Sequence, residues 1–248
     1  MKTSERHRLK DNDFANAITS AQGWFGEHQQ TLLVAIAAIV IVGGSVGGYL
    51  IWQGSVDSKS RTMLAEAMVV EESRIAPPGP PAGTTTDPNA VGGQAPGTYP
   101  TEKAKLEAAL PKFLAAADAY PTKDAGIEAR YHAASVLVGL GRFDDAIKQY
   151  DQVIGTGNSL IARMSKLGKA EAQLRAGQFD PAIASLKQLA EAKDAGLPAD
   201  GLLMELARAY RQAGKHDDAN KTFKQIVDQH ADSQFAVEAK AELEKVKS

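Results

Sequence analysis

The sequence contains no cysteine and carries almost no excess of charge. The absence of cysteine excludes disulfide bonds, thiolate metal sites and thiol catalysis, although it leaves the redox compartment open. The formal net charge of −2 at pH 7, from 28 basic and 30 acidic residues, argues against a general nucleic-acid binder. With 248 residues, 44% of them hydrophobic, the chain has room for one or two domains.

Charge is also absent from residues 31–52, TLLVAIAAIVIVGGSVGGYLIW. As a helix, this segment extends about 33 Å, which matches the hydrocarbon core of a bilayer. It shows no polar face, which a soluble core helix of this length would have. It is too long for the apolar region of a signal peptide, and QGSVDSKS follows it instead of a cleavage site. The segment is therefore predicted to be an uncleaved transmembrane anchor.

Four glycines lie within this span and form two overlapping G-x-x-x-G pairs, Gly43 with Gly47 and Gly44 with Gly48. In water each would cost a helix about 1 kcal/mol relative to alanine. In a membrane, small residues allow a second helix to come close, so the glycines predict a packing face for a partner helix or for a homodimer. A second interpretation is that glycine is simply common in membrane spans.

Residues 1–30 are predicted to be a short cytoplasmic tail, because the long carboxyl-terminal part is expected to translocate regardless of its charge. Within the tail, Phe14, Ile18, Ala21 and Phe25 recur at helical spacing. This spacing describes an amphipathic juxtamembrane helix at the membrane surface, and a helical extension of the span explains it equally well.

Proline and glycine gather in residues 76–100, which hold seven of the eleven prolines and five glycines. Almost nothing in this segment can be buried, so it is predicted to be a disordered insertion or linker. Before it, residues 58–74 are predicted to be helical, with Met63, Ala67 and Val70 on one face. No convincing strand signal follows it.

Three later segments align with one another: GRFDDAIKQYDQVI from Gly141, GQFDPAIASLKQLA from Gly177 and GKHDDANKTFKQIV from Gly214. Each copy has an alanine seven residues before its glycine, another five residues after it, and a bulky residue four positions further on. These positions are Ala134, Ala146 and Tyr150; Ala170, Ala182 and Leu186; and Ala207, Ala219 and Phe223.

This register predicts a helix hairpin in each copy. The two alanines lie where the helix backbones cross, and the bulky residue fills the groove between successive hairpins. The glycine is expected to close the first helix in a left-handed conformation, and the aspartate that follows it is expected to cap the second helix.

A fourth copy is predicted upstream, because Ala109 and Phe113 stand 37 residues before the equivalent alanine and tyrosine of the next copy. Its first helix is then residues 58–74, with Ala67 at the crossing position. The proline-rich segment becomes an insertion within this hairpin. Pro111 is expected to kink or restart the second helix.

These spacings resemble the tetratricopeptide repeat over residues 58–248, although the units are two or three residues longer than 34. Residues 233–247 are predicted to form a terminal cap helix. The predicted fold class is all-α, with one transmembrane helix followed by a tetratricopeptide-type α-solenoid. About four helix hairpins and the cap helix would make up a repeat domain over residues 53–248.

The combination of a short tail, one span and repeats resembles the family of the ancillary SecYEG translocon subunit. The phrases DAYPTKDAGIEARYHAA and DQHADSQFAVEAKAEL also resemble repeat junctions of bacterial cell-envelope proteins. The resemblance implies a single-pass inner-membrane protein with periplasmic repeats. Its implied partners are Sec translocon subunits, periplasmic chaperones or exported clients. The insertion between Ile75 and Thr101 departs from the pattern of that family.

The sequence shows no constellation of residues typical of catalysis or metal binding. The histidines lack H-E-x-x-H or other metal-ligand spacing, and the glycines of the span lack the lysine of a phosphate loop. We therefore expect no enzyme activity, no cofactor and no metal. The histidines concerned are His7, His28, His132, His216 and His230.

Repeats of this kind offer a concave surface lined by their first helices. The tetratricopeptide pattern places three residues on its inward row: Tyr131, Leu167 and Met204. Neighbouring residues one turn away are Glu128, Ser135, Met164, Glu171, Arg208 and Arg211. The row lacks the lysine of relatives that grip a carboxylate, so it suits a helix or an unfolded segment better. Burial of Leu167 and Met204 between hairpins is the other interpretation.

Two functional hypotheses follow from these features. The first is a membrane-anchored protein-protein interaction module that acts as a chaperone-like or adaptor subunit at the Sec translocon or the periplasmic quality-control machinery. The second is an oligomeric cell-envelope scaffold with fixed partners and no client. Neither hypothesis involves nucleic acid.

Overall fold

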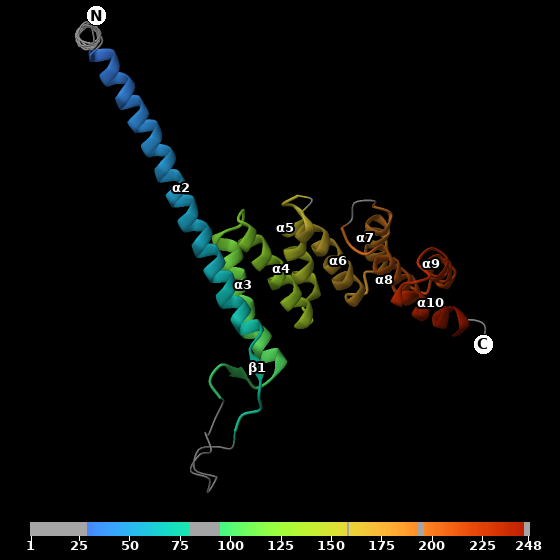
Figure 1. Cartoon of the computed structure of the whole chain (residues 1–248). Coiled ribbons are helices and arrows are strands. Elements are labelled where there is room, and N and C mark those ends of the chain that lie inside the picture. The colour runs from blue at the N-terminus through green and yellow to red at the C-terminus, as the bar shows by residue number, and fades with distance from the viewer. Residues whose placement is uncertain (1–28, 80–94, 158, 193–195, 246–248) are drawn as a thin grey trace, which may run out of the picture. The chain divides into compact units, whose positions relative to one another are not determined.

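The computed structural model describes residues 29–79, 95–157, 159–192 and 196–245 (Figure 1). The chain divides into two compact units, Met1–Val56 and Asp57–Ser248. Within the described residues, two short strands accompany the helices: β1 (Arg74–Ile75) and β2 (Thr98–Tyr99). The helices are α2 (Gln29–Glu71), α3 (Glu102–Ala119), α4 (Asp124–Gly139), α5 (Phe143–Ile154), α6 (Leu160–Arg175), α7 (Phe179–Glu191), α8 (Ala199–Gln212), α9 (His216–Gln229) and α10 (Gln234–Lys245).

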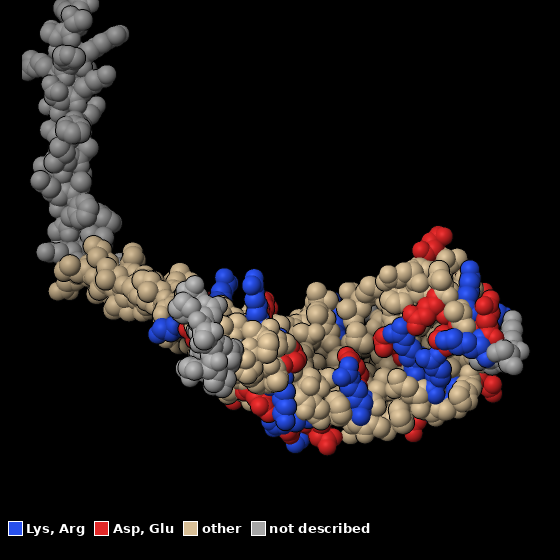
Figure 2. All heavy atoms as spheres, turned by 90° about the horizontal axis from the view of Figure 1, so that it is seen from below, with Lys and Arg blue, Asp and Glu red and all other residues tan. Residues whose placement is uncertain are grey.

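Helix α2 is 43 residues long and carries no charged residue before Asp57. Figure 2 accordingly draws its amino-terminal stretch without blue or red side chains. Large apolar side chains in this stretch are exposed, and Ile51 for example is 78% exposed. The helix is long and apolar enough to cross a membrane. The sequence predicted two helices, 31–52 and 58–74, but they are one. The connecting residues hold a single glycine and no proline, which is too weak a break to end a helix.

A two-residue parallel bridge joins the two ends of the proline-rich insertion. Strand β1 pairs with β2, and the N–H of Ala76 donates to the carbonyl oxygen of Tyr99 at 3.0 Å. The sequence predicted no strand, because two residues are too few to show a periodic signal. Residues 80–94, most of the insertion, lie outside the described residues, as does the predicted juxtamembrane helix of the tail.

The three predicted hairpins are α4 with α5, α6 with α7, and α8 with α9, and Figure 1 shows them stacked one after another. Every predicted crossing alanine is at most 2% exposed: Ala134, Ala146, Ala170, Ala182, Ala207 and Ala219. Each pair of alanines belongs to one core cluster together with its bulky residue. The predicted register is therefore confirmed.

The bulky residue of each copy packs against the next helix along the chain, as expected. Tyr150 shares a cluster with Ala172 on α6, and Leu186 shares one with Leu206 on α8. Phe223 likewise packs with Ala239 on α10. Burial of these side chains therefore couples each hairpin to its successor.

The repeated glycines close the first helices in the left-handed region, as predicted. Gly141, Gly177 and Gly214 have φ values of 74°, 76° and 72°. In the first copy the N–H of Arg142 donates to the carbonyl oxygen of Leu137 at 2.9 Å, which satisfies an end carbonyl of α4. Residues with a Cβ would be strained at this φ.

The prediction that aspartate caps the second helices is wrong. The N-cap positions are Arg142, Gln178 and Lys215, and the aspartates lie in the first helical turn, where the helix dipole favours a negative charge. Two of the aspartates also link neighbouring repeats. Asp144 accepts from Gln178 at 3.3 Å, and Asp180 from Lys215 at 2.6 Å.

The carboxyl-terminal part of α2 packs with α3 and α4 as the first helix of the upstream copy. Ala67, Ala109 and Phe113 are all 0% exposed and lie in one cluster with Leu64. The helix does not restart at Pro111, one of the two outcomes expected there, because α3 runs through this residue. Pro111 is exposed, so water can satisfy the carbonyl group whose helical hydrogen bond is lost.

Helix α10 covers the end of the last hairpin. Ala236 and Ala239 are buried against it, whereas Val237 is 73% exposed. The cap helix predicted at 233–247 is therefore present as α10.

Candidate protein-binding groove

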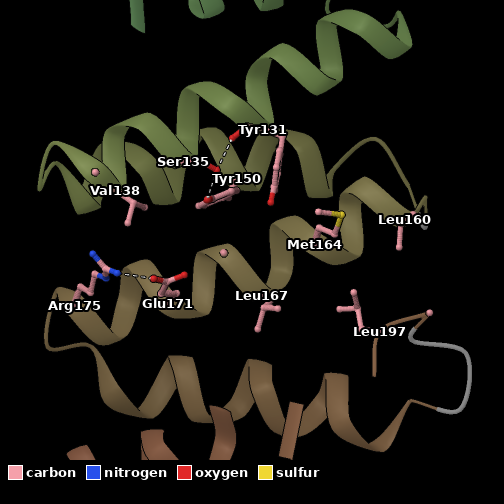
Figure 3. Close-up of a pocket in the computed structure, with 13 residues that line it drawn as sticks. Tyr131, Ser135, Val138, Tyr150, Leu160, Met164, Leu167, Glu171, Arg175 and Leu197 are labelled. Carbon is pink, nitrogen blue, oxygen red and sulfur yellow. Dashed lines mark hydrogen bonds and ion pairs between the residues drawn. The ribbon is translucent and has the colours of Figure 1, made fainter. Parts of the chain in front are cut away.

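Two adjoining hollows lie on the described surface between α4 and α8. The first, of about 620 Å³, is lined by α4, α5, α6 and the segment before α8; Figure 3 shows it in close-up. The second, of about 510 Å³, is lined by α6, α7 and α8. Leu167, Glu171 and Arg175 line both hollows, so the two form one continuous surface. We call this surface the groove.

The walls of the first hollow are largely apolar. Leu160 and Met164 on α6 are 51% and 36% exposed, and Leu197, before α8, also lines the hollow. In Figure 3 the ring of Tyr131 points from α4 toward Met164. Partly exposed apolar side chains of this kind provide the contact area on which partner binding depends.

Tyr150 lies 3% exposed at the back of the first hollow. Its hydroxyl is 3.1 Å from the Oγ of Ser135, which donates to the carbonyl oxygen of Tyr131 at 3.3 Å. Ser135 has one hydroxyl proton, so Tyr150 donates in its bond to Ser135. Burial raises the pKa of Tyr150 to about 12, which keeps this phenol neutral. A Cβ at Gly168 would stand 2.6 Å from the Cζ of Tyr150, so the ring requires a glycine there.

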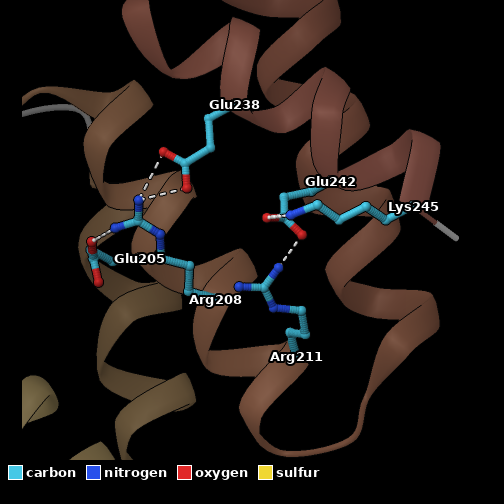
Figure 4. A network of polar contacts seen from close by, with 6 residues as sticks. All are labelled: Glu205, Arg208, Arg211, Glu238, Glu242 and Lys245. Carbon is cyan, nitrogen blue, oxygen red and sulfur yellow. Dashed lines mark hydrogen bonds and ion pairs between the residues drawn. The ribbon is translucent and has the colours of Figure 1, made fainter.

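The second hollow carries charges that are already paired. Arg175 donates to Glu171 at 2.7 Å. Arg208 donates to Glu205 at 2.7 Å and to Glu238 at 2.8 Å (Figure 4), and these contacts raise its pKa further. Each arginine that lines the hollow therefore has a carboxylate partner, and the surface has no net charge to offer an ion.

Six of the residues that the sequence placed on or beside the inward row line the groove: Tyr131, Ser135, Met164, Leu167, Glu171 and Arg208. Met204 does not line the groove, in agreement with the other interpretation of the sequence, burial between hairpins. Its side chain is 0% exposed and packs with Ala207, Phe223 and Ala239. Met204 occupies the core at the last hairpin, where α10 supplies the additional contacts.

Glu128 and Arg211 do not line either hollow. Glu128 lies near His132 and helps to raise the pKa of that imidazole. Arg211 pairs with Glu242 on α10, and its guanidinium carbon lies 6.0 Å from the ring centroid of Phe223. Glu128 thus acts beside the contact between α4 and α2, and Arg211 at the contact between α8 and α10. The four span glycines, Gly43, Gly44, Gly47 and Gly48, have no described side chain within 4 Å of an added Cβ.

The groove also contains residues that the sequence analysis did not select. Leu160 and Arg175 continue the stripe of Met164, Leu167 and Glu171 along α6 at intervals of three or four, so the helical period alone would have found them. Leu197 lies outside any helix, and no periodic signal marks it.

Among the described residues, no three His, Asp or Glu side chains are grouped so as to hold a metal ion. The titratable groups of the groove are engaged with one another, as the pairs Glu171–Arg175 and Arg208–Glu205 show. The groove therefore combines exposed apolar surface with charged groups that are already paired.

Comparison with known proteins identifies the repeats. Family models described as tetratricopeptide repeat match residues 131–198 and 173–243. Two similar solved structures are the nearly identical TPR-like repeats of a Podosopora anserina protein described as a kinesin light chain, and a variant of the same repeats with one substitution. Each is 18% identical, covers 56% of this chain and 76% of its own, and has a TM-score of 0.50, which shows a shared fold. No curated protein matches the sequence.

Neither matching family model is that of the ancillary SecYEG translocon subunit. Tetratricopeptide repeat domains are typically non-catalytic and suggest a protein-protein interaction module, and the comparison found no catalytic family. The matched residues run from the middle of α4 through α9 and include most of α10. Residues 131–243 of this chain therefore contain tetratricopeptide repeats.

Proposed function

We propose that this chain is a membrane-anchored protein-protein interaction module whose groove binds an apolar segment of a partner protein. The observation that carries the proposal is the groove itself, two adjoining hollows of about 620 and 510 Å³ along the first helices of successive repeats. Repeat arrays use such surfaces to hold extended or helical segments of other chains.

The chemistry of the groove favours a partner segment without charge. Leu160, Met164 and Leu197 present apolar surface, and the lining arginines are already engaged by carboxylates. A bound carboxylate would have to displace one of these partners, and a bound cation would face an arginine. An apolar side chain only has to replace water on the exposed leucine and methionine surfaces.

Helix α2 supports the proposed membrane anchor. None of its apolar stretch is buried, whereas the core helix of a soluble protein would be mostly covered. We propose that the tail lies in the cytoplasm and the repeats in the bacterial periplasm. The partners proposed on the resemblance noted above are exported or misfolded chains, together with Sec translocon subunits or periplasmic chaperones.

The alternative is an oligomeric scaffold without clients. It is favoured by the glycines of α2, which leave one face of the helix open to a close neighbour. In that case Gly43 and Gly47 would hold a homodimer together, and isoleucine at both positions would dissolve it in membranes.

In-cell photo-crosslinking distinguishes these functions. A photoreactive residue is placed at Leu160 or Met164 in the groove, and at Val237 on α10 as an exposed control outside it. The proposal expects many secretory precursors and translocon subunits to be captured from the groove and not from Val237. One or two constant envelope proteins would indicate the scaffold, and capture no greater than that from Val237 would overturn the groove.

A double substitution tests the contact directly. Met164→Glu with Leu167→Glu places two charges on the apolar wall and is expected to lower crosslinking from Leu160 at least about tenfold, with Val237→Glu as the matched control. Met204→Glu is unsuitable, because this buried residue would destabilise the fold. Unchanged capture in a folded double variant would contradict binding in the groove.

A further inference from the structure

The carboxyl-terminal end of α2 meets the repeats at a histidine. Nδ1 of His132, on α4, lies 3.1 Å from Oε2 of Glu71, the last residue of α2. The imidazole stacks on the ring of Phe113 on α3, with centroids 5.1 Å apart and planes at 10°, and Tyr131 packs against it edge-on at 5.7 Å. The imidazole is therefore held in place by side chains from three helices.

The charged groups that act on this imidazole are all acidic. They are Glu71 on α2, Glu72 directly after it and Glu128 on α4, while α3 presents the uncharged ring of Phe113. The hydrogen bond that Nδ1–H of His132 donates to Glu71 is the largest influence and raises the pKa of His132, whereas burial lowers it. The carboxyl-terminal end of a helix also carries a negative partial charge, which favours a nearby cation. Burial raises the pKa of Tyr131, so its phenol stays neutral in this range.

The docked segment of α2 is attached to the repeats at two points. At its beginning, Asp57 lies 2.8 Å from Nζ of Lys123, which precedes α4. Between the two contacts, Leu64 and Ala67 are buried in the cluster that contains Phe113. Of these two contacts, only the one at Glu71 contains a histidine, the side chain whose charge changes near neutral pH.

We propose that His132 and Glu71 form a pH-dependent latch that fixes the carboxyl-terminal part of α2 to the repeats in mildly acidic conditions and loosens as the pH rises. A histidine whose pKa is raised on docking stabilises the docked state. This stabilisation is fully present below the pKa of the undocked histidine, about 6.5, and is lost as the pH rises through the pKa of the docked histidine.

The latch controls how firmly the carboxyl-terminal part of α2, the first helix of the upstream copy, is docked on α3 and α4. When it loosens, Leu64 and Ala67 cover the apolar surface around Phe113 less often. Tyr131, which packs on the imidazole, also lines the first hollow, so the latch adjoins the groove. The latch is independent of the proposed function, because it requires neither a partner nor a membrane orientation.

Hydrogen exchange of the full chain in detergent micelles tests the latch. Amide protection of residues 60–71, corrected for intrinsic rates, is measured from roughly pH 5.5 to pH 8.5. Wild-type protection is expected to fall by up to about tenfold for each unit by which docking raises the pKa. His132→Gln and Glu71→Gln are expected to abolish this dependence. His216→Gln, at the exposed start of α9, is the matched control and should retain it.

Two results would overturn the latch: protection of residues 60–71 that does not change with pH in the wild type, or an unchanged dependence in both glutamine variants. If amide protection in α8 and α9 is also lost in the His132→Gln variant, that variant has unfolded. In that case the pH dependence of the Glu71→Gln variant, whose substitution lies at the helix end, decides whether the latch exists. The imidazole proton resonances give an independent reading. His132 should titrate above about 6.5 in the wild type and closer to it in Glu71→Gln, and a lower value in the wild type would contradict the latch.

Discussion

At the scale of the residue, the absence of a side chain determines how closely helices approach. A Cβ on Gly126 of α4 would stand 1.8 Å from the carbonyl oxygen of Tyr120, and one on Gly168 would meet the ring of Tyr150. Only glycine permits either contact. Both were invisible as site features in the sequence, because they depend on which group lies opposite.

Tyr150→Phe tests the polar contact at the back of the groove. Loss of the hydroxyl bonded to Ser135 is expected to lower the free energy of unfolding by about 1 kcal/mol. Because the folded pKa is raised to about 12, this phenol favours the folded state below its unfolded pKa of about 10. That advantage is lost as the pH rises toward the folded value.

Absorbance titration of tyrosine provides the measurement. The difference between the wild type and Tyr150→Phe should show a phenol that ionises near 12, whereas Tyr120→Phe, at the end of α3, serves as a half-buried control. A phenol at position 150 that ionises near its ordinary value would show that it is not buried as described.

At the scale of the element, one hairpin design recurs with different side chains. Ala134 and Ala146, Ala170 and Ala182, and Ala207 and Ala219 occupy the crossings, while tyrosine, leucine or phenylalanine fills the space before the next hairpin. The small residue is constant because backbone distance depends on it, whereas the bulky residue varies because several shapes fill the same volume.

Ala207→Leu tests the crossing. The larger side chain must separate α8 from α9, so the free energy of unfolding is expected to fall by about 1–3 kcal/mol. Ala184→Leu on α7 is the matched control, because Ala184 is exposed and its substitution should change stability by less than about 0.5 kcal/mol. Urea denaturation compares the two, and equal effects would contradict the crossing geometry.

At the scale of the whole molecule, the repeats form a one-dimensional array. Each described helix from α3 to α10 packs chiefly on its neighbours in the sequence, so stability is transmitted from one hairpin to the next. Helix α10 packs on the last matched hairpin and takes part in the core around Met204.

Removal of residues 231–248 tests this arrangement. Without α10, the core around Met204 and Phe223 becomes exposed, so amide exchange in α8 and α9 is expected to accelerate at least about tenfold while α4 and α5 keep their protection. Val237→Ser, an exposed change within α10, should leave both regions unchanged. Equal loss of protection in all repeats would show that the array unfolds as one cooperative unit.

The sequence by itself determined the features that repeat at a fixed spacing or depend on local composition. The crossing alanines, the left-handed glycines and the all-α class follow from a period of 36 or 37 residues. The long apolar helix follows from a stretch without charge. Such signals are readable because each copy repeats the same physical requirement.

Only the tertiary structure decided which residues from distant segments meet. It buried Met204 beneath α10, joined β1 to β2 across the insertion, and brought Glu71 to His132. It also placed Leu197 in the groove beside Met164. None of these contacts has a period, because each depends on the path of the chain between two segments, and that path is set by packing of the whole array.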